Sequence, residues 1–178
     1  MRSFLFFLIL STIFISGCNN NSIYEESMNA GKLALSNSEY DLAIEEFQNA
    51  LSERNYDADA SIFKEQTEKY VKAMKYYHNL KYDESLKLLD SVINMINGSS
   101  DLIKQAKTMR EVVLSDSKLD YNINLHINLA QNYFISGNYE KSLRYINLAL
   151  KYIGNNENYK VQKQALYSLK DNCYHALK

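Results

Sequence analysis

The chain of 178 residues contains no proline, no tryptophan and only five glycines. Proline and glycine are the residues that most often interrupt helices and form turns, so their scarcity favours long helices over many short strands. The formal net charge of −1 at pH 7 leaves no strong positive balance of the kind that marks proteins binding nucleic acid or anionic lipid. We therefore expect an all-α protein that binds no nucleic acid.

The first residues have the composition of a secretory signal. Arg2 supplies a positive charge, and an apolar run interrupted only by Ser11 and Thr12 extends from Phe4 to Ile15. A helix that spans a bilayer needs about 20 apolar residues, so this run is too short to cross a membrane and fits the apolar core of a signal peptide.

Ile15, Ser16, Gly17 and Cys18 follow one another at the end of that run. This order, a branched apolar residue, two small residues and a cysteine, resembles the lipobox of bacterial lipoproteins. The resemblance implies that Cys18 receives a lipid with two or more acyl chains, which anchors a protein stably to a membrane. It also implies cleavage just before Cys18. We expect a signal peptide at 1–17 and a polar tether at 18–23, in place of a plain N-terminal helix with a chance cysteine.

Three segments farther along the chain align without gaps: Tyr40–Leu51, Tyr82–Ile93 and Tyr139–Leu150. Each begins with a tyrosine and an acid, and continues with a small residue, a large apolar residue and an alanine or valine at helical spacing. These positions fall on one face of a helix. The three positions are occupied in turn by Ala43, Phe47 and Ala50, by Ser85, Leu89 and Val92, and by Ser142, Ile146 and Ala149.

Turn-forming residues stand before each aligned segment, at 36–38, 79–81 and 136–138, and an amphipathic segment precedes each turn. Each unit is therefore expected to be a helix, a short turn and a second helix. With the small residues Ala30 and Gly31 in its first helix, the first unit resembles the tetratricopeptide repeat family. The resemblance implies stacked antiparallel hairpins in one domain at 24–178, an α-solenoid with repeats at about 24–57, 66–99 and 123–156.

The spacing of the units departs from that family. The tyrosines recur 42 and then 57 residues apart, whereas the family's period is about 34 residues. We expect the longer interval to hold an additional helix within Asp101 to Leu119. A final helix at about 159–177, with Leu166, Leu169 and Cys173 on one face, is expected to cap the stack and to bury the Cys173 thiol.

In repeats of this family the first helices line a concave groove that receives a partner. Long apolar, aromatic and methionine side chains at such positions offer adaptable contact area for a peptide or helix. The same side chains would equally suit packing between helices, and the sequence leaves both interpretations open. The matching positions are Met28, Lys32 and Leu35 in the first unit, Tyr70, Met74 and Tyr77 in the second, and Ile127, Gln131 and Phe134 in the third.

No catalytic constellation is recognisable, and His78, His126 and His175 lack the spacing of metal ligands. We therefore expect neither enzymatic activity nor a cofactor. The leading hypothesis is a lipid-anchored interaction module or scaffold in the bacterial cell envelope, whose partner is another envelope protein or peptide. The alternative is an extracytoplasmic lipoprotein that binds a small molecule or glycan in the same groove. An enclosed pocket with clustered titratable groups would instead favour an enzyme.

The Asn97-Gly98-Ser99 sequence matches a glycosylation sequon. Asn-Gly also ends helices well, because glycine readily adopts the left-handed conformation after the last turn. We interpret it as such a helix end, with Gly98 in the left-handed conformation.

Lipidation at Cys18 makes a direct prediction. The mature protein should begin at Cys18, carry acyl chains and partition into detergent, whereas Cys18→Ser should leave an unlipidated precursor, because serine forms no thioether. Intact-mass measurement of both proteins checks this. A wild-type mature form that starts elsewhere and carries no lipid would contradict it.

Overall fold

The computed structural model describes residues 20–178, with side-chain burial from residue 23 onward. Over this range the regular structure is entirely helical, which confirms the expected all-α class. The chain divides into two compact units, one ending at Lys64 and the other beginning at Glu65, where a single domain was expected. Cys18 and the whole expected signal peptide lie outside the described residues.

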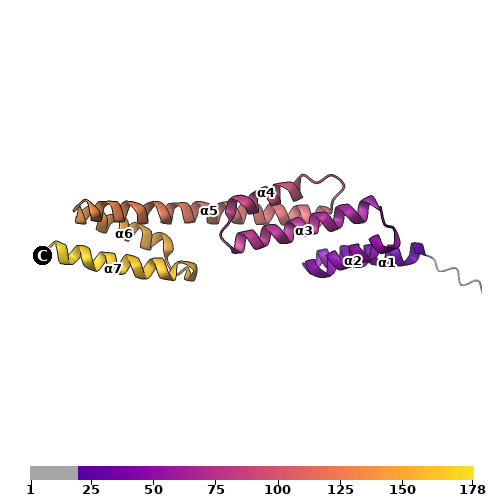
Figure 1. Cartoon of the computed structure of the whole chain (residues 1–178), viewed down its shortest axis with the longest axis horizontal. Helices are drawn as coiled ribbons and strands as arrows, with labels where there is room; N and C mark the ends of the chain where they lie inside the picture. The colour runs from indigo at the N-terminus through magenta and orange to yellow at the C-terminus, as the bar shows by residue number, and fades with distance from the viewer. Residues whose placement is uncertain (1–19) are drawn as a thin grey trace, which may run out of the picture. The chain divides into compact units, whose positions relative to one another are not determined.

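The first unit contains α1 (Asn20–Ser36), α2 (Tyr40–Glu53) and the beginning of α3 (Ala58–His78). Helices α1 and α2 lie side by side as a hairpin (Figure 1). The second unit contains the rest of α3, followed in order by α4 (Tyr82–Ile93), α5 (Ser100–Ile135), α6 (Tyr139–Ile153), the 3₁₀-helix η1 (Glu157–Tyr159) and α7 (Lys160–Ala176).

The three aligned sequence segments form α2, α4 and α6, and each helix begins at its tyrosine. This confirms the predicted helices and the turns before them. On each helix the side chains at the small, large apolar and alanine or valine positions of the aligned pattern are buried, and α6 also buries Ile153. Helical periodicity therefore places the shared pattern against the preceding helix.

The same turn closes all three hairpins. The residue two places before each tyrosine has a left-handed backbone, with φ of 62° at Ser38, 58° at Leu80 and 74° at Gly137. The N–H of the next residue then donates to a carbonyl five residues back: Glu39 to Ala34, Lys81 to Tyr76, and Asn138 to Tyr133. Such bonds satisfy carbonyl groups that a helix end otherwise leaves without partners.

Each hairpin also has one close helix contact between positions twelve residues apart. The Ser85 hydroxyl donates to the Ala73 carbonyl at 2.9 Å, and the Ser142 hydroxyl donates to the Ala130 carbonyl at 2.8 Å. All four of these side chains are fully buried. The small residues thus allow the helix backbones to approach within hydrogen-bonding reach of a short side chain.

Gly31 occupies the corresponding position of the first hairpin, opposite Ala43. A Cβ atom at Gly31 would lie 2.5 Å from the Phe47 ring, and Phe47 is fully buried. Its ring also meets Phe63 at a centroid distance of 5.4 Å. Glycine is therefore required here by the ring of Phe47.

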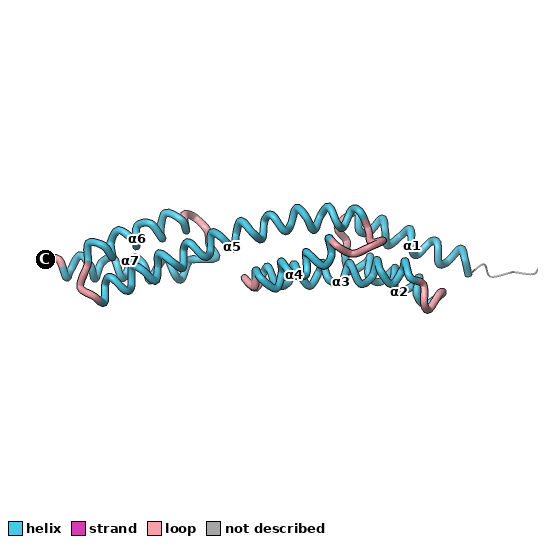
Figure 2. The backbone as a smooth tube through the Cα atoms, turned by 90° about the horizontal axis from the view of Figure 1, so that it is seen from above, coloured by secondary structure: helices cyan, strands magenta, loops and turns pink. Residues whose placement is uncertain are grey.

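The second unit is organised along α5, a continuous helix of 36 residues. The additional helix expected within 101–119 is wrong, because those residues are the first half of α5. Neither glycine nor proline occurs between Ser100 and Ile135 to break the helix. Helix α4 lies along the N-terminal half of α5 and α6 along its C-terminal half (Figure 2). An ion pair of 2.7 Å between Asp90 and Arg110 joins α4 to α5.

The loop between α4 and α5 is held by Gln66, whose side chain is fully buried. The Gln66 amide donates to the Val92 carbonyl at 3.1 Å and accepts from the Ser99 N–H at 2.7 Å. A Cβ atom at Gly98 would lie 2.5 Å from this amide. The expected role of Gly98 is wrong: Asn97 has the left-handed backbone, with φ of 60°, and Gly98 leaves space for Gln66.

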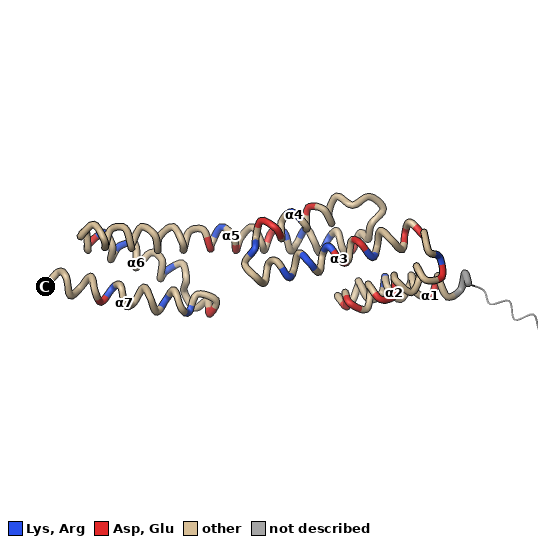
Figure 3. Tube along the Cα trace, in the orientation of Figure 1, with Lys and Arg blue, Asp and Glu red and all other residues tan. Residues whose placement is uncertain are grey.

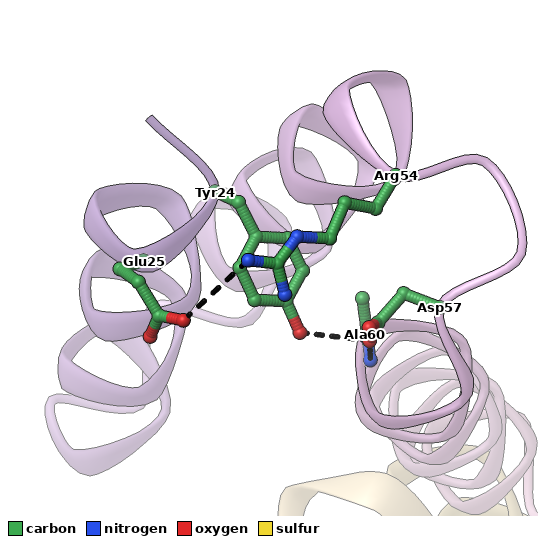
Figure 4. A network of polar contacts seen from close by, with 5 residues as sticks. All are labelled: Tyr24, Glu25, Arg54, Asp57 and Ala60. Carbon is green, nitrogen blue, oxygen red and sulfur yellow. Dashed lines mark hydrogen bonds and ion pairs between the residues drawn. The ribbon is translucent and has the colours of Figure 1, made fainter. Parts of the chain in front are cut away.

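A polar network joins the three helical segments of the first unit (Figure 4). The Tyr24 hydroxyl donates to Asp57 Oδ1 at 2.8 Å, and the same oxygen accepts from the Ala60 N–H at 2.9 Å. The Arg54 guanidinium lies 3.7 Å from the centre of the Tyr24 ring, and its Nη2 is 3.9 Å from Glu25 Oε1. Burial and the bond to Asp57 raise the pKa of Tyr24 to about 12.

The contact of Gly31 with Phe47 predicts that Gly31→Ala destabilises the protein. Alanine favours a helix by up to about 1 kcal/mol over glycine, but overpacking a rigid contact costs roughly 1–3 kcal/mol. The clash should dominate in denaturant unfolding. Asn29→Ala, at an exposed site of the same helix, is the control. Adding Phe47→Leu should make Gly31→Ala less harmful than it is alone; equal harm in both backgrounds would contradict the contact.

Candidate functional site

Two of the three groove positions predicted in the first unit are buried. Met28 is 3% exposed and Leu35 is 1% exposed, so the prediction that they face a groove is wrong. They flank Gly31 at helical spacing and so belong to a broad packed face of α1. Lys32 is exposed, and its ammonium lies 5.4 Å from the centre of the Phe63 ring.

The second set divides in a similar way. Tyr70 is 5% exposed and is therefore a packing residue, which corrects its assignment to a groove. Met74 and Tyr77 are partly exposed. The Tyr77 hydroxyl donates to Asp116 Oδ2 on α5 at 2.5 Å, so this side chain is tied to the neighbouring helix.

Two positions of the third set face a hollow between α5 and α7. Ile127 and Gln131 on α5 line a space of about 800 Å³ together with residues of α7. Phe134 is absent from its lining and packs edge-on against Tyr139 at 5.5 Å, next to the core of α5, α6 and α7. We call this space the α5–α7 hollow. Its remaining lining residues are Asn158, Val161, Gln162, Ala165, Leu166, Ser168, Leu169 and Asn172.

The α5–α7 hollow exists because α7 packs mainly on α6 and contacts α5 little. The buried face of α7 includes Leu166 and Cys173, which confirms the expected buried thiol. Val161, in the first turn of α7, is 75% exposed. The lining consists of aliphatic, amide and hydroxyl side chains, with no charged residue among them. Such a lining suits a ligand whose surface is uncharged and apolar but also carries hydrogen-bonding groups.

A second pocket lies at the middle of α5, and sequence reasoning missed it. Asp116 accepts a hydrogen bond from Tyr77 at the end of α3, and Asp120 accepts one of 2.9 Å from Tyr159 in η1. The two aspartates are four residues apart, on the same helical stripe as the fully buried Val113 and Ile123. Two acids within an apolar stripe were the signal for this site.

Three tyrosines at this pocket have a raised pKa. The hydrogen bond to Asp116 raises the pKa of Tyr77 to about 12, with burial as the next cause. Burial, followed by the bond to Asp120, raises the pKa of Tyr159 above its usual value. Burial also raises that of Tyr82. The Tyr77 and Tyr159 hydroxyls donate their protons to Asp116 and Asp120, and these hydrogen bonds favour the neutral phenols.

His126 differs from the other histidines because its Nδ1 is buried without a hydrogen-bond partner. Its ring stacks between Tyr145, at 5.9 Å, and Tyr152, at 5.4 Å. His78 and His175 are exposed. Over residues 20–178 no group of three or more histidine, cysteine or acidic side chains could hold a metal ion.

Charged residues of both signs are interspersed along α3, α4 and α5 (Figure 3). None of the helices in the described part of the chain combines the length and apolarity needed to cross a bilayer. Comparison of the chain with protein-family models, with curated proteins and with solved structures found no match. The α5–α7 hollow of the second unit is the basis for a functional proposal.

The hydrogen bond from Tyr77 to Asp116 predicts a pH-dependent stability. The pKa of Tyr77 is about 12 in the folded protein and about 10 in an unfolded chain. Its stabilising effect is thus complete below pH ~10 and is lost as the pH rises through ~12. At pH 7, Tyr77→Phe should lower the free energy of unfolding by about 1.5 kcal/mol, the value typical of a bond to a charged group.

Denaturant unfolding of wild type and Tyr77→Phe at increasing pH measures this difference, which should shrink above pH ~10. Tyr56→Phe removes a phenol that is 98% exposed and is the matched control. A difference that stays constant up to pH ~12, or an equal loss in both variants, would show that the bond does not stabilise the fold.

Proposed function

We propose that this protein is a lipid-anchored interaction module of the bacterial cell envelope, and that it binds another polypeptide in the α5–α7 hollow. The hollow supports the proposal because it lies between α5, the first helix of the third hairpin, and α7, the last helix. It contains two of the residues that the resemblance to tetratricopeptide repeats implies for partner binding, Ile127 and Gln131. Attachment through Cys18 and a tetratricopeptide-like relation among the hairpins are parts of the same proposal.

The chemistry of the hollow favours one kind of occupant. Its apolar residues include Ile127, Val161 and Leu169, and its amides include Gln131 and Gln162. Charged groups would lose hydration here without gaining a partner, which is costly. An amphipathic helix of the partner, with an uncharged apolar face, would bury that face and satisfy the amides along its edge. Recognition of a helix in a groove depends on such apolar anchors.

Site-specific photocrosslinking in the producing cells tests this proposal. A photoreactive residue at Val161, which lines the hollow, should capture one polypeptide in the membrane fraction. The same residue at Val112 is the control, because Val112 is also exposed on a helix of this unit but lines neither hollow. A charge in the hollow, introduced as Ala165→Asp, should abolish the crosslink from Val161.

Mass spectrometry of the crosslinked peptide then shows which segment of the partner was captured. A segment with an apolar face supports the proposal. Equal capture from Val161 and Val112, or none from Val161 while the protein remains in the membrane fraction, would overturn it.

A further inference from the structure

The pocket at the middle of α5 has the shape of a small-ligand site. Its volume is about 260 Å³, and four parts of the second unit enclose it: the end of α3, the start of α4, the middle of α5 and the segment around η1. These parts are far apart in the sequence. They meet because α4 packs along the N-terminal half of α5 and α6 packs along its C-terminal half. The pocket is separate from the α5–α7 hollow, although the segment around η1 contributes to both.

The pocket carries uncompensated negative charge. Asp116 lines it, and Asp120 lies one helical turn away, against Tyr159. Neither carboxylate forms an ion pair within the described residues, and the lining includes no lysine or arginine. Lys81 borders a neighbouring hollow that includes Asp120, but its ammonium lies over the Tyr76 ring at 5.9 Å.

The hydrogen bonds of Asp116 leave it able to bind a ligand. An ionised carboxylate has about four acceptor positions, and the Tyr77 hydroxyl is the one donor to Asp116 among the described contacts. The hydrogen bond from Tyr77 therefore orients the Asp116 carboxylate and leaves its other acceptor positions available to a ligand. A cation in the pocket would gain a charge-assisted hydrogen bond, which is stronger than a neutral one.

Aromatic rings form much of the wall. Tyr77, Tyr82, Tyr159 and His78 all line the pocket. The Tyr77 and Tyr82 rings have centres 6.2 Å apart and planes inclined by 59°, so they meet as adjoining walls and do not stack. Ring faces attract organic cations, and inclined rings around a small space are the arrangement that holds alkylated ammonium groups.

Asn156 and Asn158 complete the lining beside η1 and add neutral amides. The Asn156 side-chain oxygen already accepts from the Asn158 N–H at 3.0 Å, which orders this segment. Amide oxygens accept hydrogen bonds from an ammonium or a hydroxyl group without adding charge. Carboxylate, rings and amides together match a compact, singly charged organic cation better than an anion or a neutral sugar.

We propose that the pocket between α3, α4, α5 and η1 binds a small organic ammonium group. The ammonium belongs either to a free amine or to a lysine side chain of a bound polypeptide. The site is distinct from the α5–α7 hollow, so its failure and that of the proposed function are separately observable.

Calorimetric titration of the full chain, purified in detergent, tests this proposal. The probes are choline, ethanolamine and a lysine blocked at both backbone ends, and the neutral control is dimethylbutanol, the carbon isostere of choline. At least one cation should bind with a dissociation constant on the order of 1 mM or below, and dimethylbutanol should bind at least about tenfold more weakly, since it lacks the charge. Tighter binding of blocked lysine than of the free amines identifies a polypeptide as the source.

Matched variants locate the site. Asp116→Asn preserves the acceptor for Tyr77 but removes the charge, and it should weaken cation binding about tenfold. Asp101→Asn, at an exposed position of the same helix, should leave it unchanged. Tyr82→Leu removes a ring of the wall and should bind more weakly than Tyr82→Phe, which keeps it; circular dichroism confirms that each variant folds. No binding of any cation, equal binding of dimethylbutanol, or equal effects of Asp116→Asn and Asp101→Asn would overturn the proposal.

Discussion

The continuity of α5 is the constraint on which the second unit depends. A helix of 36 residues is about 54 Å long at a rise of about 1.5 Å per residue, three times the length of α4 with its 12 residues. It therefore has room for α4 on one half and α6 on the other. The turn between α3 and α4 and the segment around η1 both reach the middle of α5, where Asp116 and Asp120 accept their tyrosines. The pocket at the middle of α5 follows from the placement of the two hairpins on different halves of this helix, because a helix of ordinary length would bring them side by side.

Local patterns in the sequence predicted the hairpins well. The starts of α2, α4 and α6, the turns before them and the buried small residues such as Ala43 all depend on interactions within about a dozen residues. Helix periodicity and turn chemistry act over that range. The buried Cys173 was predictable for the same reason, since its apolar neighbours lie on its own helix.

Other features depend on contacts that no local pattern contains. The interval before the third hairpin was visibly long, but its length did not distinguish a separate helix from an extension of α5. Met28 and Tyr70 have the residue types of a binding surface, yet the width of the packed face, set by neighbouring helices, buries them. Asp116 and its partner Tyr77 are 39 residues apart. Two sequence features could have indicated this arrangement. They are the absence of glycine and proline from α5 and the presence of two acids in its apolar stripe.

The serine hydroxyls of the hairpins have a consequence for how the chain opens. In the second and third hairpins, separating the helices would leave the buried hydroxyl of Ser85 or Ser142 without its acceptor until water enters, a penalty of roughly 1–3 kcal/mol. The first hairpin has Ala43 and Gly31 at the corresponding positions, and neither residue carries a hydroxyl. Separating Gly31 from Ala43 therefore breaks dispersion contacts at these positions, while the contacts of Arg54 with Tyr24 and Glu25 join the two helices elsewhere. The two serines therefore oppose partial opening of the second and third hairpins at the point where the helices approach most closely.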